Sequence, residues 1–127
     1  MGEGITFTDR ELDVMSVLWR RGSGTVTEVK QDLEGDPGYT TVLKILQILE
    51  EKGMVRHEQE GRAYRYHPVV ESADAGEEAL DRIVDKIFQG SAELALARLV
   101  ERRRLKPEEV ERMKALLDDA SKRGRGR

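Results

Sequence analysis

The stretch from Gly38 to Gly53 constrains the fold most, because its apolar residues repeat with the period of an α-helix. One narrow helical stripe collects the apolar residues Val42, Ile45, Leu46 and Leu49. Polar side chains lie opposite this stripe: Thr40, Lys44, Gln47 and Glu51. The stretch therefore predicts a helix over about residues 39–52 that buries one side and presents hydrogen-bonding groups near its N-terminus. A helix that enters the DNA major groove has this design, and so does an ordinary amphipathic surface helix.

Two earlier helices are predicted by capping boxes, in which a threonine and a glutamate three residues later cap each other's backbone amide groups. Residues 8–11 form the first box and open a helix that ends near Gly22. Residues 25–28 form the second box and open a short helix that stops at the turn-forming run 34–38. The chain thus begins with three short helices.

After Gly53 the pattern changes its period from 3.6 to 2. Residues 54–60 and 63–67 alternate around a tight connection and predict a β-hairpin. Residues 22–26 could add a short third strand. A hairpin that directly follows the third of three short helices predicts a winged helix-turn-helix.

Three more amphipathic helices are predicted after Pro68; Ser72 caps the first, Ser91 begins the second and Pro107 opens the third. Their apolar stripes are the candidates for dimerisation: Leu80, Ile83, Val84, Ile87, Phe88, Leu96, Leu99, Val100, Val110, Met113 and Leu117. These helices have too little partner surface to bury the stripes within one protomer, whereas a symmetric dimer supplies it. A monomer whose helices fold back on the winged domain is the alternative.

The predicted fold is mainly α-helical with a small β-hairpin. A winged-helix DNA-binding domain is expected over residues 1–70 and a helical dimerisation domain over residues 71–120. Residues 121–127 form a basic, glycine-rich tail that we expect to be disordered and capable of weak phosphate contact.

The composition excludes several classes of function. The chain has no cysteine, which rules out disulfides and thiolate metal sites and favours an intracellular, cytoplasmic setting. No apolar run approaches the roughly 20 residues of a membrane span. There is no thiol nucleophile, no glycine-rich phosphate loop and no serine in a nucleophile elbow, so we predict no enzyme, no metal site and no cofactor.

The net charge of −3 argues against nucleic-acid binding unless the basic groups gather on one face. Residues 1–70 carry 9 Lys and Arg against 12 Asp and Glu, and residues 71–127 carry 13 of each kind. Neither half of the chain is therefore basic overall.

The candidates for contacts to DNA are Thr27, Tyr39, Thr40, Thr41, Lys44, Gln47 and Arg62. The threonine hydroxyls of the third helix can contact phosphate or a base, and their methyl groups suit a thymine methyl. Lys44 suits guanine or phosphate, and Gln47 has the geometry for a bidentate contact to adenine. Thr27 on the second helix is expected to contact phosphate, and Arg62 at the hairpin tip to contact phosphate or the minor groove.

Some of these residues have alternative roles. Thr40 could be only a helix cap, Tyr39 could pack at the helix entrance, and Arg62 could be merely solvated. Conversely, Arg56 and Arg65 on the solvent faces of the strands could add phosphate neutralisation.

Four ring residues of the hairpin are assigned to structure rather than to function. Tyr64 and Tyr66 share one face, and we expect both in the core rather than as stacking platforms. His57 and His67 have no Asp or Glu partner at ligand spacing and are interpreted as ordinary surface residues.

The chain resembles the penicillinase repressor family of bacterial winged-helix regulators, which includes the BlaI, MecI and CopY types. The segments that carry the similarity are TDRELDVMSVLW (8–19), TVTEV (25–29), YTTV (39–42), LEEKG (49–53), GRAYRY (61–66) and FQGS (88–91). Their order and spacing together are specific, and the similarity runs from about residue 5 to residue 118. The resemblance implies a homodimeric repressor with an inverted-repeat operator.

The resemblance also implies a way of ending repression. In the BlaI and MecI branch, a membrane receptor protease senses a β-lactam, and the repressor is cleaved in its dimerisation domain. The family's scissile Asn-Phe pair would align here with Arg98 and Leu99, which makes these residues the candidate proteolytic site and departs from the family pattern. The CopY branch binds copper or zinc through a C-terminal cysteine motif, which the absence of cysteine excludes.

The sequence therefore predicts a homodimeric transcriptional repressor that places residues 39–52 in the major groove and is relieved when its dimerisation domain is cut or disrupted. Its expected partners are double-stranded operator DNA, a second copy of itself and a membrane sensor protease. The alternative is a winged-helix scaffold that binds protein rather than DNA, which the negative net charge favours.

Overall fold

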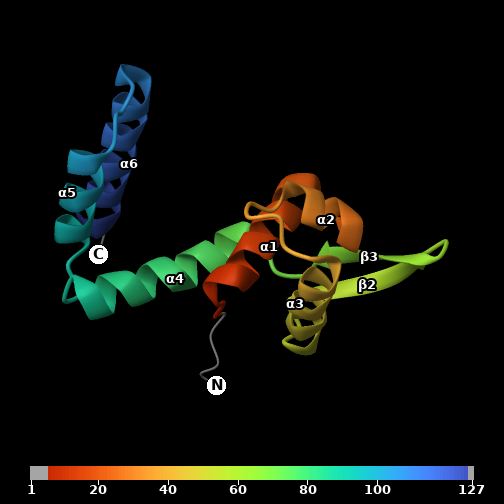
Figure 1. Cartoon of the computed structure of the whole chain (residues 1–127). Helices are drawn as coiled ribbons and strands as arrows, with labels where there is room; N and C mark the ends of the chain where they lie inside the picture. The colour runs from red at the N-terminus through yellow and green to blue at the C-terminus, as the bar shows by residue number, and fades with distance from the viewer. Residues whose placement is uncertain (1–5, 126–127) are drawn as a thin grey trace. The chain divides into compact units, whose positions relative to one another are not determined.

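The computed structural model describes residues 6–125, which form six helices and a small three-stranded sheet (Figure 1). The elements are α1 (Asp9–Arg21), β1 (Gly24–Thr25), α2 (Val26–Asp32), α3 (Tyr39–Glu51), β2 (Val55–Glu60), β3 (Ala63–Pro68), α4 (Ser72–Ile87), α5 (Ala92–Arg102) and α6 (Pro107–Arg125). The mainly helical fold class with a β-hairpin is confirmed. Contacts divide the chain into two compact units after Arg82, within α4. The boundary at residue 70 between a DNA-binding domain and a dimerisation domain stays a prediction.

Both predicted capping boxes are present. In α1, the Glu11 amide donates to Thr8 Oγ1 at 3.1 Å, and the Thr8 amide donates to Glu11 Oε1 at 3.0 Å. In α2, Thr25 and Glu28 make the same exchange at 3.2 and 3.1 Å. α1 is capped at its C-terminus by Gly22, whose φ of 89° lies in the left-handed region that glycine adopts without strain.

The apolar stripe of α3 packs into the core of the N-terminal unit. Val42, Leu46 and Leu49 are fully buried, and Ile45 is partly buried against the same core. The other buried members come from α1, α2 and the sheet: Val14, Met15, Val17, Leu18, Val26, Val29, Val55 and Tyr66. Full burial of one such aliphatic side chain contributes about 1.5–3 kcal/mol, so the stripe holds α3 firmly in one orientation.

The sheet has the strand order β1–β3–β2, with antiparallel pairing on both sides of β3. β1 is the short third strand that the sequence suggested. Tyr66 is 2% exposed, which confirms its place in the core, but the same prediction for Tyr64 is wrong, because Tyr64 is 49% exposed. The tip of the hairpin projects past α2 and α3 (Figure 1), and near the start of β3 Tyr64 pairs with the exposed Gln59.

A buried carboxylate joins the start of α1 to the end of α3. Glu11 is only 6% exposed, and Lys52, the residue after α3, donates a 2.7 Å hydrogen bond from Nζ to Glu11 Oε1. Burial raises the pKa of Glu11, but the hydrogen bonds from Lys52 and from the Thr8 amide outweigh burial and hold this pKa below its ordinary value. The ion pair therefore fixes the C-terminal end of α3 relative to α1.

The first part of α4 is attached to the N-terminal unit. Trp19 Nε1 donates a 2.8 Å hydrogen bond to the Val70 carbonyl, and the Val69 amide donates to the Met54 carbonyl at 2.9 Å. Ala75, on α4, is 6% exposed. These contacts explain why the compact N-terminal unit extends past residue 70.

In the C-terminal unit, α5 and α6 border an apolar groove of about 410 Å³. Its lining residues are Glu93, Leu96, Ala97, Val100, Leu105, Val110, Met113, Lys114 and Leu117. Ser91 caps α5 by accepting a 3.0 Å hydrogen bond from the Leu94 amide, as predicted. None of residues 83–124 is buried, so the apolar stripes of this unit remain partly or fully open to solvent.

The prediction of a disordered tail is wrong for residues 121–125, which continue α6 as far as Arg125. Lys122 and Arg123 place positive charge near the C-terminal end of the helix dipole, which stabilises the last turns. One glycine in a helix, here Gly124, costs only about 1 kcal/mol relative to alanine. Residues 126–127 lie outside the described part of the chain.

We expect Lys52→Met to destabilise the fold at neutral pH by about 2 kcal/mol, because it leaves the Glu11 carboxylate buried without its partner. The pKa of Glu11 lies below its ordinary value in the wild type, so the ion pair stabilises the fold at neutral pH and loses that effect as pH falls through the lowered pKa. The difference between variant and wild type should therefore shrink in acid. Urea unfolding at neutral and acidic pH measures both effects.

The control for that measurement is Lys30→Met, which removes a lysine whose partner Asp36 is exposed and should cost little. Equal losses of unfolding free energy in the two variants would contradict a stabilising role of the Glu11–Lys52 pair. A loss in Lys52→Met that is the same at both pH values would also contradict it.

Candidate nucleic-acid interface

The outward side of α3 is free of neighbouring segments. Thr40, Thr41, Lys44 and Gln47 are all exposed, and Tyr39 is 52% exposed. The buried stripe on the other side of α3 sets this orientation, so the exposure of these residues follows from the helical period.

The N-terminus of α3 is capped by Gly38, which makes no side-chain hydrogen bond to the helix. Thr40 lies inside the helix and is not its N-cap, so the alternative role considered for Thr40 is wrong. The first amide groups of α3 have no capping side chain, and such amides together with the helix dipole favour an anion.

Two cations of the predicted interface are uncommitted. Among residues 6–125, no ion pair or hydrogen bond of the side chain involves Lys44 or Arg62, and both are exposed. Arg62 lies at the turn between β2 and β3, and Thr27 is exposed in the first turn of α2. Arg56 lies 3.4 Å from Glu58 on the same strand, so its charge is partly compensated.

Arg65 is not the free phosphate ligand that the sequence suggested. Its guanidinium is bound by Glu28 and Glu60, and its side chain is only 22% exposed. These carboxylates raise the pKa of Arg65, Glu60 first and Glu28 second. The partners lie 37 and 5 residues away in the chain, and no local pattern indicates the longer contact.

The two histidines are also not the unpartnered surface residues that were predicted. His57 Nδ1 lies 2.7 Å from both carboxylate oxygens of Glu50 on α3, and its ring lies 4.6 Å from the ring of Tyr64. His67 is half-buried, and its Nε2 lies 3.3 Å from Glu58 Oε1 in a geometry that does not make a hydrogen bond. Glu50 comes close to His57 only when the hairpin folds against α3, and Glu58 comes close to His67 only when the two strands of the hairpin pair.

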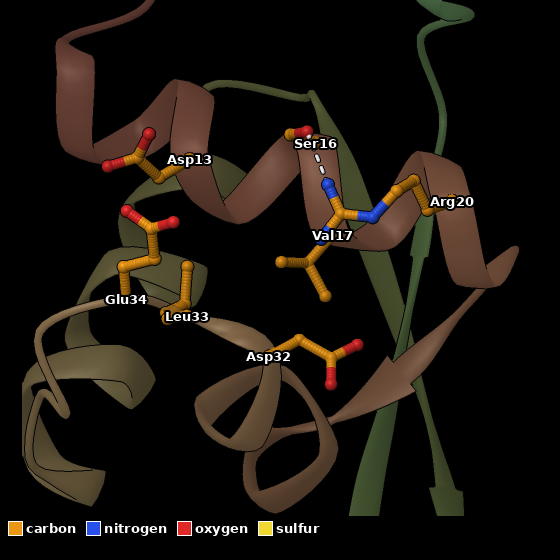
Figure 2. A pocket seen from close by; sticks show the side chains of 7 residues that line it. All are labelled: Asp13, Ser16, Val17, Arg20, Asp32, Leu33 and Glu34. Atoms are coloured by element: carbon orange, nitrogen blue, oxygen red, sulfur yellow. Dashed lines mark hydrogen bonds between the residues drawn. The ribbon is translucent and has the colours of Figure 1, made fainter.

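A hollow of about 270 Å³ lies between α1 and the end of α2 (Figure 2). Its lining residues are Asp13, Ser16, Val17, Arg20, Asp32, Leu33 and Glu34. Arg20 Nη1 donates a 3.0 Å hydrogen bond to Ser16 Oγ, and Asp32 is paired with Arg21 at 2.8 Å. The carboxylates of this hollow repel phosphate, so its electrostatic character differs from that of the exposed side of α3.

The candidate proteolytic pair lies within a helix. Arg98 and Leu99 belong to α5, where Arg98 is 3.4 Å from Glu101 and Leu99 is 52% exposed. Both side chains are accessible, but a protease that reads extended backbone has to unwind α5 locally to reach the peptide bond between them.

Residues 6–125 contain no cluster of three or more metal-ligating side chains that could hold an ion. Within the same residues, every helix is too short or too polar to cross a membrane.

The chain is similar in sequence to several known regulators. It is 26% identical to the penicillinase repressor of Bacillus licheniformis over 118 residues, which cover 91% of this chain and 92% of the relative. It is 38% identical to the transcriptional regulator BlaI of Mycobacterium tuberculosis over 101 residues, which cover 74% of this chain and 71% of the relative.

A solved structure shares the fold of the N-terminal part. The DNA-binding domain of the repressor BlaI matches 58% of this chain with a TM-score of 0.51, 32% sequence identity and 93% of its own length covered. These relatives are regulators and not enzymes, which confirms the prediction that the chain has no catalytic function. The penicillinase repressor model matches residues 7–119, and the chain therefore belongs to the penicillinase repressor family.

Proposed function

We propose that this chain is a cytoplasmic, homodimeric transcriptional repressor that binds an inverted-repeat operator. The observation that carries this proposal is the exposed, uncommitted polar side of α3, which the core holds rigidly while Lys44 remains without an acidic partner among the described residues. The similarity of the N-terminal unit to the DNA-binding domain of BlaI supports the same function.

In this proposal, α3 lies in the major groove and reads base edges. Lys44 contacts guanine or phosphate, and Gln47, one turn later, contacts adenine. Thr40 and Thr41 are short enough to let the helix approach the groove closely, and their hydroxyl groups contact phosphate or bases.

Phosphate contacts from other elements fix the register of α3. The exposed Thr27 on α2 and the hydroxyl of Tyr39 at the start of α3 contact phosphate. The hairpin acts as the wing, and from it Arg62 reaches the DNA backbone or the minor groove. Because these residues come from three elements of one rigid unit, they define a single docking geometry.

The apolar residues of the C-terminal helices supply the dimer interface. Leu80, Ile83 and Ile87 of α4 are 59%, 45% and 64% exposed, and Leu99 and Leu117 are 52% and 56% exposed. A second copy covers this apolar surface, and two-fold symmetry then matches two half-sites of an inverted repeat.

Disruption of residues 72–118 ends repression in this proposal. Cleavage between Arg98 and Leu99 by a membrane sensor protease is one such route, and it requires local unwinding of α5. Joining two half-sites contributes through effective concentration, so loss of the dimer releases DNA even though each N-terminal unit stays folded.

A protein-binding scaffold is the second candidate function. The net charge of −3 and the carboxylate-lined hollow between α1 and α2 favour it. The two functions differ in their dependence on salt, because phosphate contacts release counterions from DNA.

We expect Lys44→Ala to weaken binding to a DNA duplex that the wild-type chain selects from a random pool, by about 1–3 kcal/mol for a base contact. A phosphate contact would instead lower the slope of log Kd against log salt by about 1. A salt titration by fluorescence anisotropy measures both quantities. Arg112→Gln, which removes one exposed charge from α6, is the control and should change neither. Wild-type binding that is insensitive to salt and to Lys44→Ala would favour the scaffold.

We expect Leu117→Glu to convert the dimer to a monomer, because it places a charge in the apolar surface that the second copy covers. Affinity for the inverted repeat should fall by a factor on the order of 10²–10⁴, while affinity for one half-site is retained. Sedimentation equilibrium measures the mass, and Leu12→Glu on α1, where Leu12 is 44% exposed, is the matched control. A monomeric wild type, or an unchanged mass in Leu117→Glu, would refute the proposed interface.

A further inference from the structure

The guanidinium of Arg65 is fully occupied. Its Nε and Nη2 donate to the two carboxylate oxygens of Glu60 at 2.7 and 3.0 Å. Its Nη1 and Nη2 donate to the two carboxylate oxygens of Glu28 at 3.1 and 3.3 Å, and Nη1 also donates to Ser23 Oγ at 3.1 Å. These contacts use all five N–H donors of the side chain, a fork-like geometry that lysine cannot reproduce.

The two carboxylates lie next to proposed phosphate contacts. Glu28 directly follows Thr27 in the first turn of α2, and Glu60 ends β2, two residues before Arg62 at the wing tip. Arg65 on β3 therefore connects the start of α2 with the end of β2, next to the tip of the wing.

Both carboxylates are charged at neutral pH. The Thr25 amide, followed by Arg65, lowers the pKa of Glu28, and Arg65 lowers the pKa of Glu60. Arg21 lies 3.8 Å from Glu28 and also lowers the pKa of Glu28, but Arg21 binds Asp32 more closely, at 2.8 Å, so its effect on Glu28 is the smaller one. Within residues 6–125, Arg65 is the cation that hydrogen-bonds to both carboxylates.

We propose that Arg65 is a positioning residue of the DNA-binding surface. Its positive charge offsets one of the two negative charges of Glu28 and Glu60 beside the phosphate path, and its hydrogen bonds tie the wing to α2 at a fixed spacing. This inference rests on the proposed DNA-binding function. It also accounts for how a chain with more acidic than basic residues over residues 1–70 keeps one edge compatible with phosphate.

The first test is Arg65→Gln, measured on the duplex that the wild-type chain selects from a random pool. Two uncompensated carboxylates then face phosphate, so affinity should fall by about tenfold or more at low salt. Salt screens this repulsion, and the deficit should shrink as the salt concentration rises. A purely structural defect has no reason to recover with salt. Arg112→Gln is the control for the loss of one positive charge.

The second test is a gain of binding, which misfolding cannot produce. Glu60→Gln frees part of the Arg65 charge, and affinity should rise by about threefold or more with a steeper dependence on salt. The combined variant with Arg65→Gln, Glu28→Gln and Glu60→Gln should recover most of the affinity that Arg65→Gln loses. Glutamine at residue 28 still serves the capping box, and thermal melts check that each variant folds.

The outcomes separate this inference from the function on which it rests. If the wild-type chain selects no duplex, both fall. If it binds DNA but Glu60→Gln binds no more tightly, or Arg65→Gln binds as the wild type does, DNA binding stands and the role of Arg65 is wrong. Failure of the combined variant to recover affinity would likewise overturn the proposal that Arg65 offsets carboxylate charge at this edge.

Discussion

Burial of one side of α3 is the constraint on which the rest of the N-terminal unit depends. Val42, Leu46 and Leu49 are fully enclosed by α1, α2 and the sheet, and the Glu11–Lys52 pair fixes the end of the same helix. A helix has only one outward side once its apolar stripe is enclosed. The exposure of Thr40 and Lys44 is therefore a direct consequence of core packing.

Local physical chemistry explains which features could be predicted from the sequence. Capping boxes and the 3.6 and 2 residue periods depend on neighbours in the chain, and these gave α1, α2, α3 and the hairpin close to their observed limits. Several errors concern contacts between separate elements: Arg65 with Glu28, His57 with Glu50, and the exposure of Tyr64 on the hairpin. No single-sequence pattern encodes these distances.

The electrostatics of the N-terminal unit depend on pairing more than on net charge. Most of its acids near the wing and α2 have a basic partner within the fold, as Glu28, Glu60 and Asp32 illustrate. Meanwhile Lys44 and Arg62 have no acidic partner among residues 6–125. A negative total charge is thus compatible with a local surface whose free charges are positive, and the carboxylate-lined hollow on α1 and α2 discourages phosphate elsewhere.

The two units differ in how completely they bury their apolar residues. The N-terminal unit encloses a core from five of its elements, whereas no residue among 83–124 is buried. A unit without an enclosed core gains little stability from its own packing, since the hydrophobic contribution scales with the area removed from water. The C-terminal helices therefore depend on further burial, and a second copy offers it by symmetry. Because of that dependence, the proposed dimer interface is less stable than the core of the N-terminal unit. A local change in α5 or α6 can therefore separate the dimer and leave the DNA-binding unit folded.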